Sequence, residues 1–382
     1  MAKNSDTQDS FEEGFGGGEP AETTGRSGGS MSISRGVEQP TNTAASYLRK
    51  KRTLTVDEHV EGIRAGDRVI LGRTITLIES SLPEHHAKAL EIVERIMPDT
   101  GNAVRIGITG VPGVGKSTFI ESFGQHAIAQ GRRVAVLAID PSSEISGGSI
   151  MGDKTRMEKL SGSDAAFIRP SPSAGSLGGV ARKTREVMLL CEAAGYDIVF
   201  IETVGVGQSE TMVHGMVDFF LLLMLAGAGD EMQGIKKGII ELADAMVIHK
   251  ADGDNVHRAM KAKEEFSGAL HYLRPQAPGW TPPVLTASSL TGEGITDVWE
   301  TMTEFHDTMT ANGYIAARRR KQAVNWLHET IQHSLRERFL SDPSTAERLP
   351  LLEREVQEGT TPPLAAAATL LKNFFDEEID MF

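Results

Sequence analysis

The stretch that decides the fold is Gly110-Val111-Pro112-Gly113-Val114-Gly115-Lys116-Ser117. It follows an apolar run at 104–109 and precedes a helical pattern at about 117–130. This is the phosphate-binding loop G-x-x-x-x-G-K-[ST] in a strand–loop–helix context. Its glycines let backbone N–H groups converge on phosphate oxygens, and the helix N-terminus favours negative charge. The stretch predicts nucleotide contacts from Gly110 through Thr118, with Lys116 reaching the β- and γ-phosphates and the Ser117 hydroxyl ligating Mg²⁺.

Composition limits the classes of protein that this chain can represent. Its 382 residues suffice for one large domain with appendages or for two domains. The 39 Lys and Arg against 52 Asp and Glu give a net charge of −13, which argues against nucleic acid or an anionic membrane as the main partner. The single cysteine, Cys191, excludes an intrachain disulfide framework and suits a reducing cytosol. The longest apolar run, 219–226, falls short of the ~20 residues that span a bilayer, so we expect a cytoplasmic protein.

The chain divides into four segments by composition and pattern. Residues 1–52 are rich in Gly, Ser and Thr and are expected to be a disordered tail. Residues 53–101 predict a helical segment that begins with the capping box Thr55-Val56-Asp57-Glu58. We assign 102–310 to a nucleotide-binding domain and 311–382 to a helical C-terminal segment.

Strand and helix patterns alternate through the central segment. Short, almost continuously apolar runs favour a parallel sheet that is buried on both faces. They occur at 104–109, 134–140, 197–203, 219–225, 245–249 and 284–288. A strand follows directly after the helix at 117–130, and this βαβ succession predicts a doubly wound, mostly parallel α/β domain with its ligand at the carboxyl ends of the strands.

The C-terminal segment predicts two amphipathic helices. The first, from about Asn312, carries an apolar stripe, and the second runs from Pro363 to Glu378. The stripe consists of Val324, Leu327, Ile331, Leu335 and Phe339. Such a stripe needs cover, either from its own domain or from a second subunit. The basic run Arg318-Arg319-Arg320-Lys321 is expected to be a solvated helix face.

Three further stretches at the ends of apolar runs fit a GTPase. Glu202-Thr203-Val204-Gly205 has the D/E-x-x-G form of a turn that senses Mg²⁺ and the γ-phosphate. His249-Lys250-Ala251-Asp252 is close to the base-reading form N-K-x-D, whose carboxylate accepts from guanine N1–H and N2–H. Ala287-Ser288-Ser289 could place a backbone N–H on guanine O6. The order of the three stretches at successive strand ends predicts guanine as the base.

His249 stands where the base-reading pattern has asparagine. An asparagine amide donates and accepts together, whereas a neutral imidazole divides the two roles between its nitrogens. Losing one hydrogen bond costs about 0.5–1.5 kcal/mol, so guanine affinity is expected to fall by up to roughly tenfold. Adenine opposite the Asp252 carboxylate would be a costlier mismatch, so guanine remains the expected base.

Three acidic residues lie at or beyond the predicted strand ends. Asp140, Asp153 and Glu202 could gather around Mg²⁺, directly or through water. Carboxylate oxygens are ligands that this cation prefers.

Together, these stretches resemble the MeaB/ArgK family, the GTPase chaperones of adenosylcobalamin-dependent acyl-CoA mutases such as methylmalonyl-CoA mutase. The resemblance covers about residues 55–340. Besides the phosphate loop, it rests on Asp140-Pro141-Ser142-Ser143, Gly152-Asp153-Lys154-Thr155-Arg156-Met157, Glu202-Thr203-Val204-Gly205-Val206-Gly207-Gln208-Ser209-Glu210 and Gly227-Ala228-Gly229-Asp230-Glu231-Met232-Gln233-Gly234-Ile235-Lys236-Lys237-Gly238. His249 and the Gly-rich N-terminus depart from the family pattern.

The resemblance implies a GTPase that couples GTP binding and hydrolysis to adenosylcobalamin loading and protection of such a mutase. It implies switch loops near 140–157, 203–214 and 227–238, and a homodimer formed through the C-terminal helices. The Mg²⁺ ligands that it implies are Ser117, Asp140, Asp153 and Glu202. The catalytic residues are then Lys116, Asp153 and Glu202, and the residues that contact GTP or GDP beyond the phosphate loop are Gly205, His249, Lys250, Asp252, Ser288 and Ser289.

Three other functions remain open on the sequence. A nickel-type metallocentre-assembly GTPase usually displays His-rich tracts or Cys pairs, whereas the eleven histidines here are scattered and Cys191 is alone. A protein kinase acting on a transport protein would transfer the γ-phosphoryl group to another protein. A nucleotide-gated binding module would show negligible turnover. The nearest glutamine beyond Gly205 is Gln208, so we expect slow hydrolysis that a partner accelerates.

Overall fold

A computed structural model describes residues 53–80, 82–139, 157–170, 177–203, 209–227, 237–270 and 276–375. All of these residues from Leu54 onward belong to one unit of the chain. The predicted tail at 1–52 lies outside the described residues.

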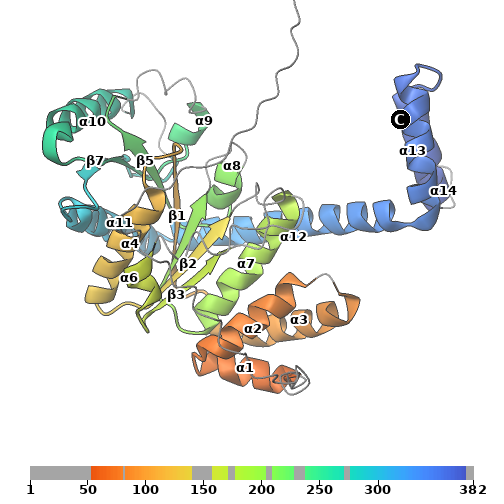
Figure 1. Ribbon diagram of the computed structural model, residues 1–382, viewed down its shortest axis with the longest axis horizontal. Helices are drawn as coiled ribbons and strands as arrows, with labels where there is room; N and C mark the ends of the chain where they lie inside the picture. Colours follow the sequence, from red (N-terminus) through yellow and green to blue (C-terminus); the bar gives the residue numbers. More distant parts are fainter. Residues whose placement is uncertain are drawn as a thin grey trace, which may run out of the picture. The chain divides into compact units, whose positions relative to one another are not determined.

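The described residues form one sheet of seven parallel strands in the order β3-β2-β4-β1-β5-β6-β7 (Figure 1). The strands are β1 (Val104–Gly110), β2 (Val134–Ile139), β3 (Ala166–Pro170), β4 (Ile198–Thr203), β5 (Phe219–Leu225), β6 (Ala245–His249) and β7 (Val284–Ala287). The predicted parallel α/β sheet is confirmed, and all six predicted strands are present within about one residue. The structure adds β3 at one edge, where its final Pro170 removes no hydrogen bond from a central ladder.

Helices cover both faces of this sheet. They are α1 (Val56–Arg64), α2 (Arg68–Glu79), α3 (Pro83–Ile96), α4 (Lys116–Ala129), α6 (Glu158–Ser161), α7 (Leu177–Ala193), α8 (Ser209–His214), α9 (Lys237–Ile240), α10 (Val256–Leu270), α11 (Ile295–Ala311), α12 (Tyr314–Ser341), α13 (Pro343–Gln357) and α14 (Pro363–Phe375), with 3₁₀ turns η2 (Met97–Asp99) and η4 (Gly253–Asn255). The predicted capping box at the start of α1 is present, with reciprocal hydrogen bonds between Thr55 and Glu58.

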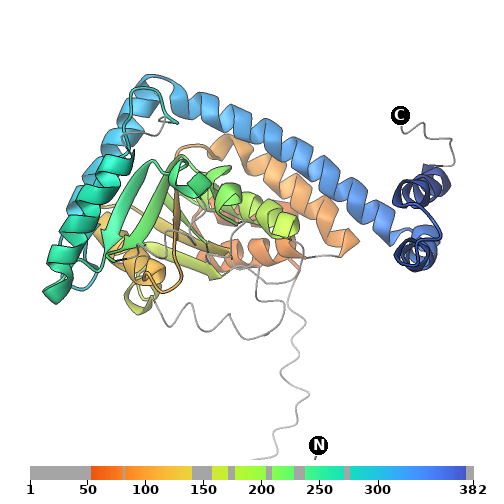
Figure 2. The same ribbon diagram turned by 90° about the horizontal axis from the view of Figure 1, so that it is seen from above.

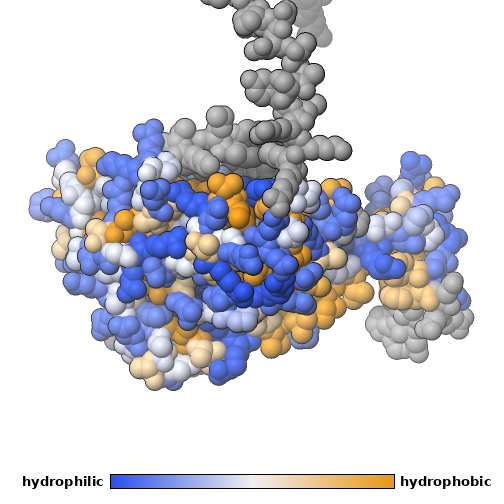
Figure 3. Space-filling model, turned by 90° about the horizontal axis from the view of Figure 1, so that it is seen from below, coloured by the Kyte–Doolittle hydropathy of each residue, from blue (hydrophilic) through white to orange (hydrophobic). Residues whose placement is uncertain are grey.

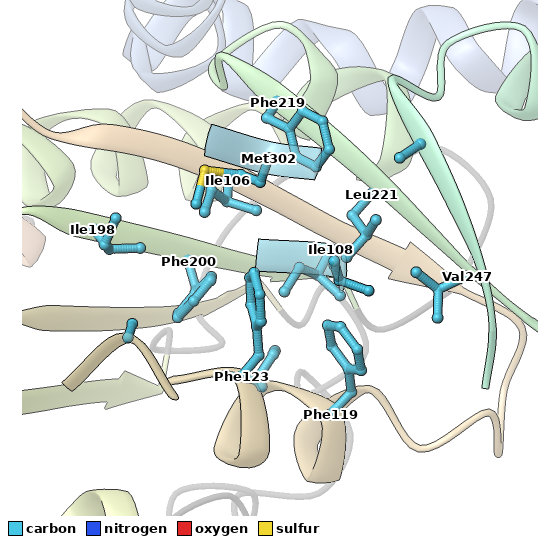
Figure 4. Packing of buried hydrophobic residues seen from close by; sticks show 14 of the residues in the cluster. Ile106, Ile108, Phe119, Phe123, Ile198, Phe200, Phe219, Leu221, Val247 and Met302 are labelled. Carbon is cyan, nitrogen blue, oxygen red and sulfur yellow. The ribbon is translucent and has the colours of Figure 1, made fainter. Parts of the chain in front are cut away.

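Alternate strand residues supply the two sides of the core. On β4, Phe200 packs beneath α4 and α11, whereas Ile201 faces the cluster built from α1–α3 and α7. Figure 4 shows Phe119 and Phe123 of α4 pointing at the strand side chains of the first side. Cys191 of α7 lies fully buried on the second side, and burial raises the pKa of its thiol, as expected of a packing residue. The phosphate loop is thus anchored by core packing beneath both of its flanking elements.

The start of α12 is tied to the sheet by ion pairs, which corrects the expected solvated face at 318–321. Arg319 pairs with the Asp218 carboxylate at 2.5 Å, and Arg318 pairs with Asp244 at 3.3 Å. These two acids directly precede β5 and β6, and both are buried. A buried carboxylate needs a charged partner, and α12 provides one for each. The other two basic residues of the run are exposed, as expected.

Beyond these ion pairs, α12 passes beside α7 and reaches α13 and α14, which pack on each other (Figure 2). The predicted stripe is exposed from Val324 to Leu335, while Phe339 is covered by edge contact with Phe374 of α14. Figure 3 shows apolar surface next to the C-terminal helices on an otherwise mainly hydrophilic face. Helix α13 was not predicted. None of the described helices is long and apolar enough to cross a membrane.

Candidate functional site

The predicted phosphate loop joins β1 to α4 at the carboxyl end of the central strand. Gly110 has φ 155°, and a Cβ there would lie 2.4 Å from the carbonyl oxygen of Leu223 on β5. Gly113 and Gly115 have φ of 77° and 94°, in the region that side chains rarely adopt. Glycine is therefore required at these turns, and α4 begins immediately afterwards at Lys116.

The Lys116 side chain folds back over the loop. It is 9% exposed, and its ammonium donates to the carbonyl of Gly110 at 2.9 Å and to that of Val111 at 3.4 Å. Burial lowers the pKa of Lys116, and the nearby carboxylates of Glu202 and Glu210 oppose that shift. A phosphate oxygen would offer this ammonium a stronger, charge-assisted hydrogen bond than a carbonyl does. The loop therefore holds a cation where an anion can engage it.

Ser117, at the start of α4, and Glu202, near the end of β4, are joined by a hydrogen bond. The Ser117 hydroxyl donates to Glu202 Oε1 at 2.9 Å, and Glu202 is a buried residue near the carboxyl end of β4. A hydroxyl and a carboxylate side by side form a hard oxygen donor set, which is the kind that Mg²⁺ prefers. These two residues therefore fit the predicted cation.

Several predicted residues lie outside the described part of the chain. They are Asp140, Asp153 and Gly205, together with most of the predicted switch loops at 140–157 and 227–238 and residues 204–208 of the loop at 203–214. Among the described residues, no group of three or more His, Cys, Asp or Glu side chains could hold a metal ion.

The loops after β6 and β7 are joined through Asp252 and Ser288. The Ser288 hydroxyl donates to Asp252 Oδ2 at 2.5 Å and accepts from the backbone N–H groups of Leu290 and Thr291. This arrangement fixes one oxygen of the carboxylate within the protein. The two predicted base-reading stretches are therefore neighbours, at the same edge of the sheet as the phosphate loop.

Lys250 connects the base-reading loop to the phosphate loop. Its φ of 59° is the one positive value among the described non-glycine residues. Asn255 supports that conformation by donating to the Lys250 carbonyl at 2.7 Å, while the Lys250 ammonium donates to Gly113 O at 2.9 Å. Such backbone strain persists only where the surroundings fix it, and it clusters at functional sites.

His249 makes a second connection between these loops. Its Nδ1 lies 2.7 Å from the carbonyl oxygen of Val114, and its Nε2 lies 2.7 Å from the Ser289 hydroxyl. The side chain is buried, and burial lowers its pKa. The ring therefore joins the phosphate loop, the end of β6 and the loop after β7.

Two features of the site were not predicted. The hydroxyls of Thr109 and Thr203 are buried and bond at 2.9 Å between the ends of β1 and β4. Glu210 of α8 is buried near Lys116. Thr203 and Glu210 both belong to the stretch at 202–210, which was predicted from the sequence to lie near the nucleotide. That assignment could have identified both residues as neighbours of the phosphate loop.

Comparisons with known proteins agree with this geometry. The sequence profile described as "Methylmalonyl Co-A mutase-associated GTPase MeaB" matches residues 71–344. A "Putative GTPase" of Caulobacter vibrioides is 56% identical over 321 residues, which cover 84% of this chain and 98% of the relative. The mouse "Methylmalonic aciduria type A homolog, mitochondrial" is 47% identical over 337 residues, covering 86% of this chain and 81% of the mouse protein.

A solved structure extends the likeness to the fold. The crystal structure of a protein named LAO/AO transport system kinase superposes with a TM-score of 0.67 at 39% identity. The match covers 84% of this chain and 98% of that chain.

Proposed function

Because the chain belongs to the MeaB family of GTPases, we propose that it couples GTP binding and hydrolysis to adenosylcobalamin loading and protection of a cobalamin-dependent acyl-CoA mutase. The matching profile and relatives confirm the family resemblance predicted from the sequence, and the chain is a GTPase that binds guanine nucleotide. The observation that carries the site assignment is the meeting of Lys116, the Ser117–Glu202 pair and the Asp252–Ser288 pair at one edge of the sheet.

In this proposal, residues 102–310 form the GTPase domain, and residues Gly110 to Thr118 hold the phosphates. Ser117 and Glu202 hold Mg²⁺, together with Asp140 and Asp153. The cation, when bound, neutralises charge on the β- and γ-phosphates.

The chain's own residues then do three things. Lys116 and the backbone amides of the loop stabilise the charge that develops on the transferred phosphoryl group. Glu202 orients the Ser117 hydroxyl through their hydrogen bond. Asp252 selects guanine, because its free carboxylate oxygen and the remaining lone pair of the oxygen bonded to Ser288 can accept from N1–H and N2–H of the base.

The cognate mutase is expected to raise the GTPase rate by at least about tenfold, equivalent to ~1.4 kcal/mol of barrier. In this proposal, a partner that orders the glycine-rich predicted switch loops aligns water with the γ-phosphate. Steady-state phosphate release, measured with and without methylmalonyl-CoA mutase and its relatives, tests this. If no cobalamin-dependent mutase stimulates hydrolysis, the chaperone role fails while the GTPase activity stands.

The loop at 227–238 is the proposed transmitter of that stimulation. Ala substitutions at Lys236 and Lys237 are expected to remove the response to the mutase and to leave basal turnover unchanged, since neither residue is among those predicted to bind the phosphates. Ala substitutions at Lys261 and Lys263 of α10 serve as the matched control. A normal response in the Lys236/Lys237 double variant would exclude this loop as the transmitter.

The exposed stripe of α12 is proposed to pair with a second copy of the chain. Leu327 and Ile331 are 57% and 46% exposed on one face of the helix. Placing glutamates at both positions is expected to convert a dimer to a monomer in light scattering at micromolar concentration, because charges would be buried in an apolar contact. Gln332→Glu, on the same helix, should remain dimeric. A monomeric wild type would refute the proposal.

A kinase activity remains the second candidate, because the similar solved structure bears the name of a transport system kinase. Nucleotide labelled at the γ-phosphate distinguishes the two. Release of the label as free phosphate supports the GTPase proposal, whereas its appearance on another protein supports the kinase.

A further inference from the structure

We infer that His249 is a positioning residue that braces the phosphate loop against the loop after β7, and that it makes no hydrogen bond to the base. This inference rests on the proposed nucleotide site. It differs from the sequence expectation, in which position 249 contacts guanine as the asparagine of N-K-x-D would.

The hydrogen-bond partners of the ring leave neither nitrogen available. The carbonyl oxygen of Val114 can only accept, so His249 Nδ1 carries the hydrogen of that 2.7 Å bond. Nε2 of the neutral ring then has a lone pair, and the Ser289 hydroxyl donates to it at 2.7 Å. Both bonding positions of the imidazole are therefore taken by the protein.

Packing holds the ring in this orientation. The side chain is 2% exposed, and the ring of Phe119 on α4 meets it edge-on, with centroids 5.6 Å apart. A Cβ at Gly115 would lie 3.1 Å from Cε1 and 3.3 Å from Nδ1 of the imidazole. Because Gly115 has no Cβ, there is room for the imidazole ring beside it. Turning the ring towards a ligand would break its two hydrogen bonds and its contact with Phe119.

The arrangement has a consequence for base recognition. Guanine carries its N1–H and N2–H donors on one edge and the N7 acceptor on another. Asp252 can accept from the first edge, but a ring with both nitrogens engaged cannot donate to N7. Recognition by this chain therefore depends on Asp252 and on the loop that His249 holds through Ser289, and the N7 atom contributes no hydrogen bond to position 249.

The nucleotide analogue 7-deaza-GTP, which has carbon in place of N7, tests this on the wild-type protein. The expected result is a kcat/KM for 7-deaza-GTP within about twofold of that for GTP. A preference for GTP of more than about twofold would overturn the inference, because a hydrogen bond to N7 is worth about two- to tenfold. In His249→Asn, the amide is free to donate to the base, and a preference for GTP of about two- to tenfold is expected to appear.

A double-mutant cycle tests the brace itself. Ser289→Ala is expected to raise the KM for GTP by about two- to tenfold in the wild type and to have no further effect in His249→Ala. Independent, additive effects of the two substitutions would contradict a shared role. Ser267→Ala, on the outer side of α10, is the matched control for the loss of a hydroxyl.

The failure of this inference is distinguishable from that of the proposed function. If the wild type hydrolyses GTP and discriminates strongly against 7-deaza-GTP, the assignment of the nucleotide site is supported and the inference about His249 is wrong. If GTP hydrolysis survives removal of Lys116, the site assignment itself is wrong. The analogue assay requires no variant, so poor folding of His249→Ala does not prevent the decision.

Discussion

Replacing Lys116 by alanine is expected to lower the GTP hydrolysis rate by about 100- to 1000-fold, the range for removing one preorganised charge-stabilising group. The ammonium lies on the phosphate loop itself, bonded to the Gly110 and Val111 carbonyls. No other described lysine is placed on the loop in this way except Lys250, whose ammonium is bonded to Gly113 O at the loop's outer side. Single-turnover release of labelled phosphate gives the measurement.

The matched control for this change is Lys159→Ala, because Lys159 is an exposed lysine on the short helix α6. It should retain the wild-type rate. Thermal melting of Lys116→Ala shows whether the fold is intact, and loss of activity in a folded variant is the expected result. If Lys116→Ala hydrolyses GTP at close to the wild-type rate, the assignment of the phosphate site to this loop is wrong.

The second large effect is expected at Asp252. Replacing it by asparagine keeps an oxygen that accepts from Ser288, so the loop after β7 should remain in place. The amide presents one acceptor and one donor to the base, and its donor opposes the N2 amino group of guanine. Xanthine carries an oxygen in place of that amino group and suits the amide.

Asp252→Asn should therefore lower kcat/KM for GTP by at least about 1000-fold, since a site built to accept hydrogen bonds rejects mismatched groups strongly. It should also reverse the preference in favour of XTP. Asp254→Asn, two residues further on and exposed, is the control and should hydrolyse GTP normally. An unchanged preference for GTP in Asp252→Asn would mean that another residue reads the base.

The central strands and the phosphate loop were predictable because each carries a local signal. Continuous apolar runs mark strands that are buried on both faces, and the loop motif combines spacing with context. β3 was not predicted, because Arg169 and Pro170 interrupt its apolar pattern. A strand at the edge of a sheet tolerates both residues. Whether a strand lies at the edge depends on the order of all strands in the sheet and cannot be read from its own sequence.

Two other features depended on tertiary contacts. Helix α13 contains Pro350 and starts at Pro343, so its sequence reads as broken although its first proline is favourable at a helix start. The buried pairing of Arg318 and Arg319 required acids that lie about 75–100 residues earlier in the chain. Periodicity within one helix contains no information about such partners.

The same limit applies to the candidate site. The residue types at Lys116, Ser117 and Asp252 follow from motifs, whereas the bonds that His249 makes to Val114 and Ser289 join segments distant in sequence. The departure from asparagine was visible in the sequence. The two hydrogen bonds that the imidazole makes instead became visible only in the three-dimensional structure.

The order of the strands bears on how the protein folds. β1 pairs with β4 on one side and with β5 on the other, so neither neighbour of the central strand is its successor in the chain. During synthesis, β1 emerges first and both of its edges stay unpaired until β4 and β5 have been made. Pairing over such separations must close long loops, which slows folding and leaves apolar strand edges exposed to aggregation. The phosphate loop can therefore form only late, and nucleotide that binds it selectively stabilises chains whose central sheet is already closed.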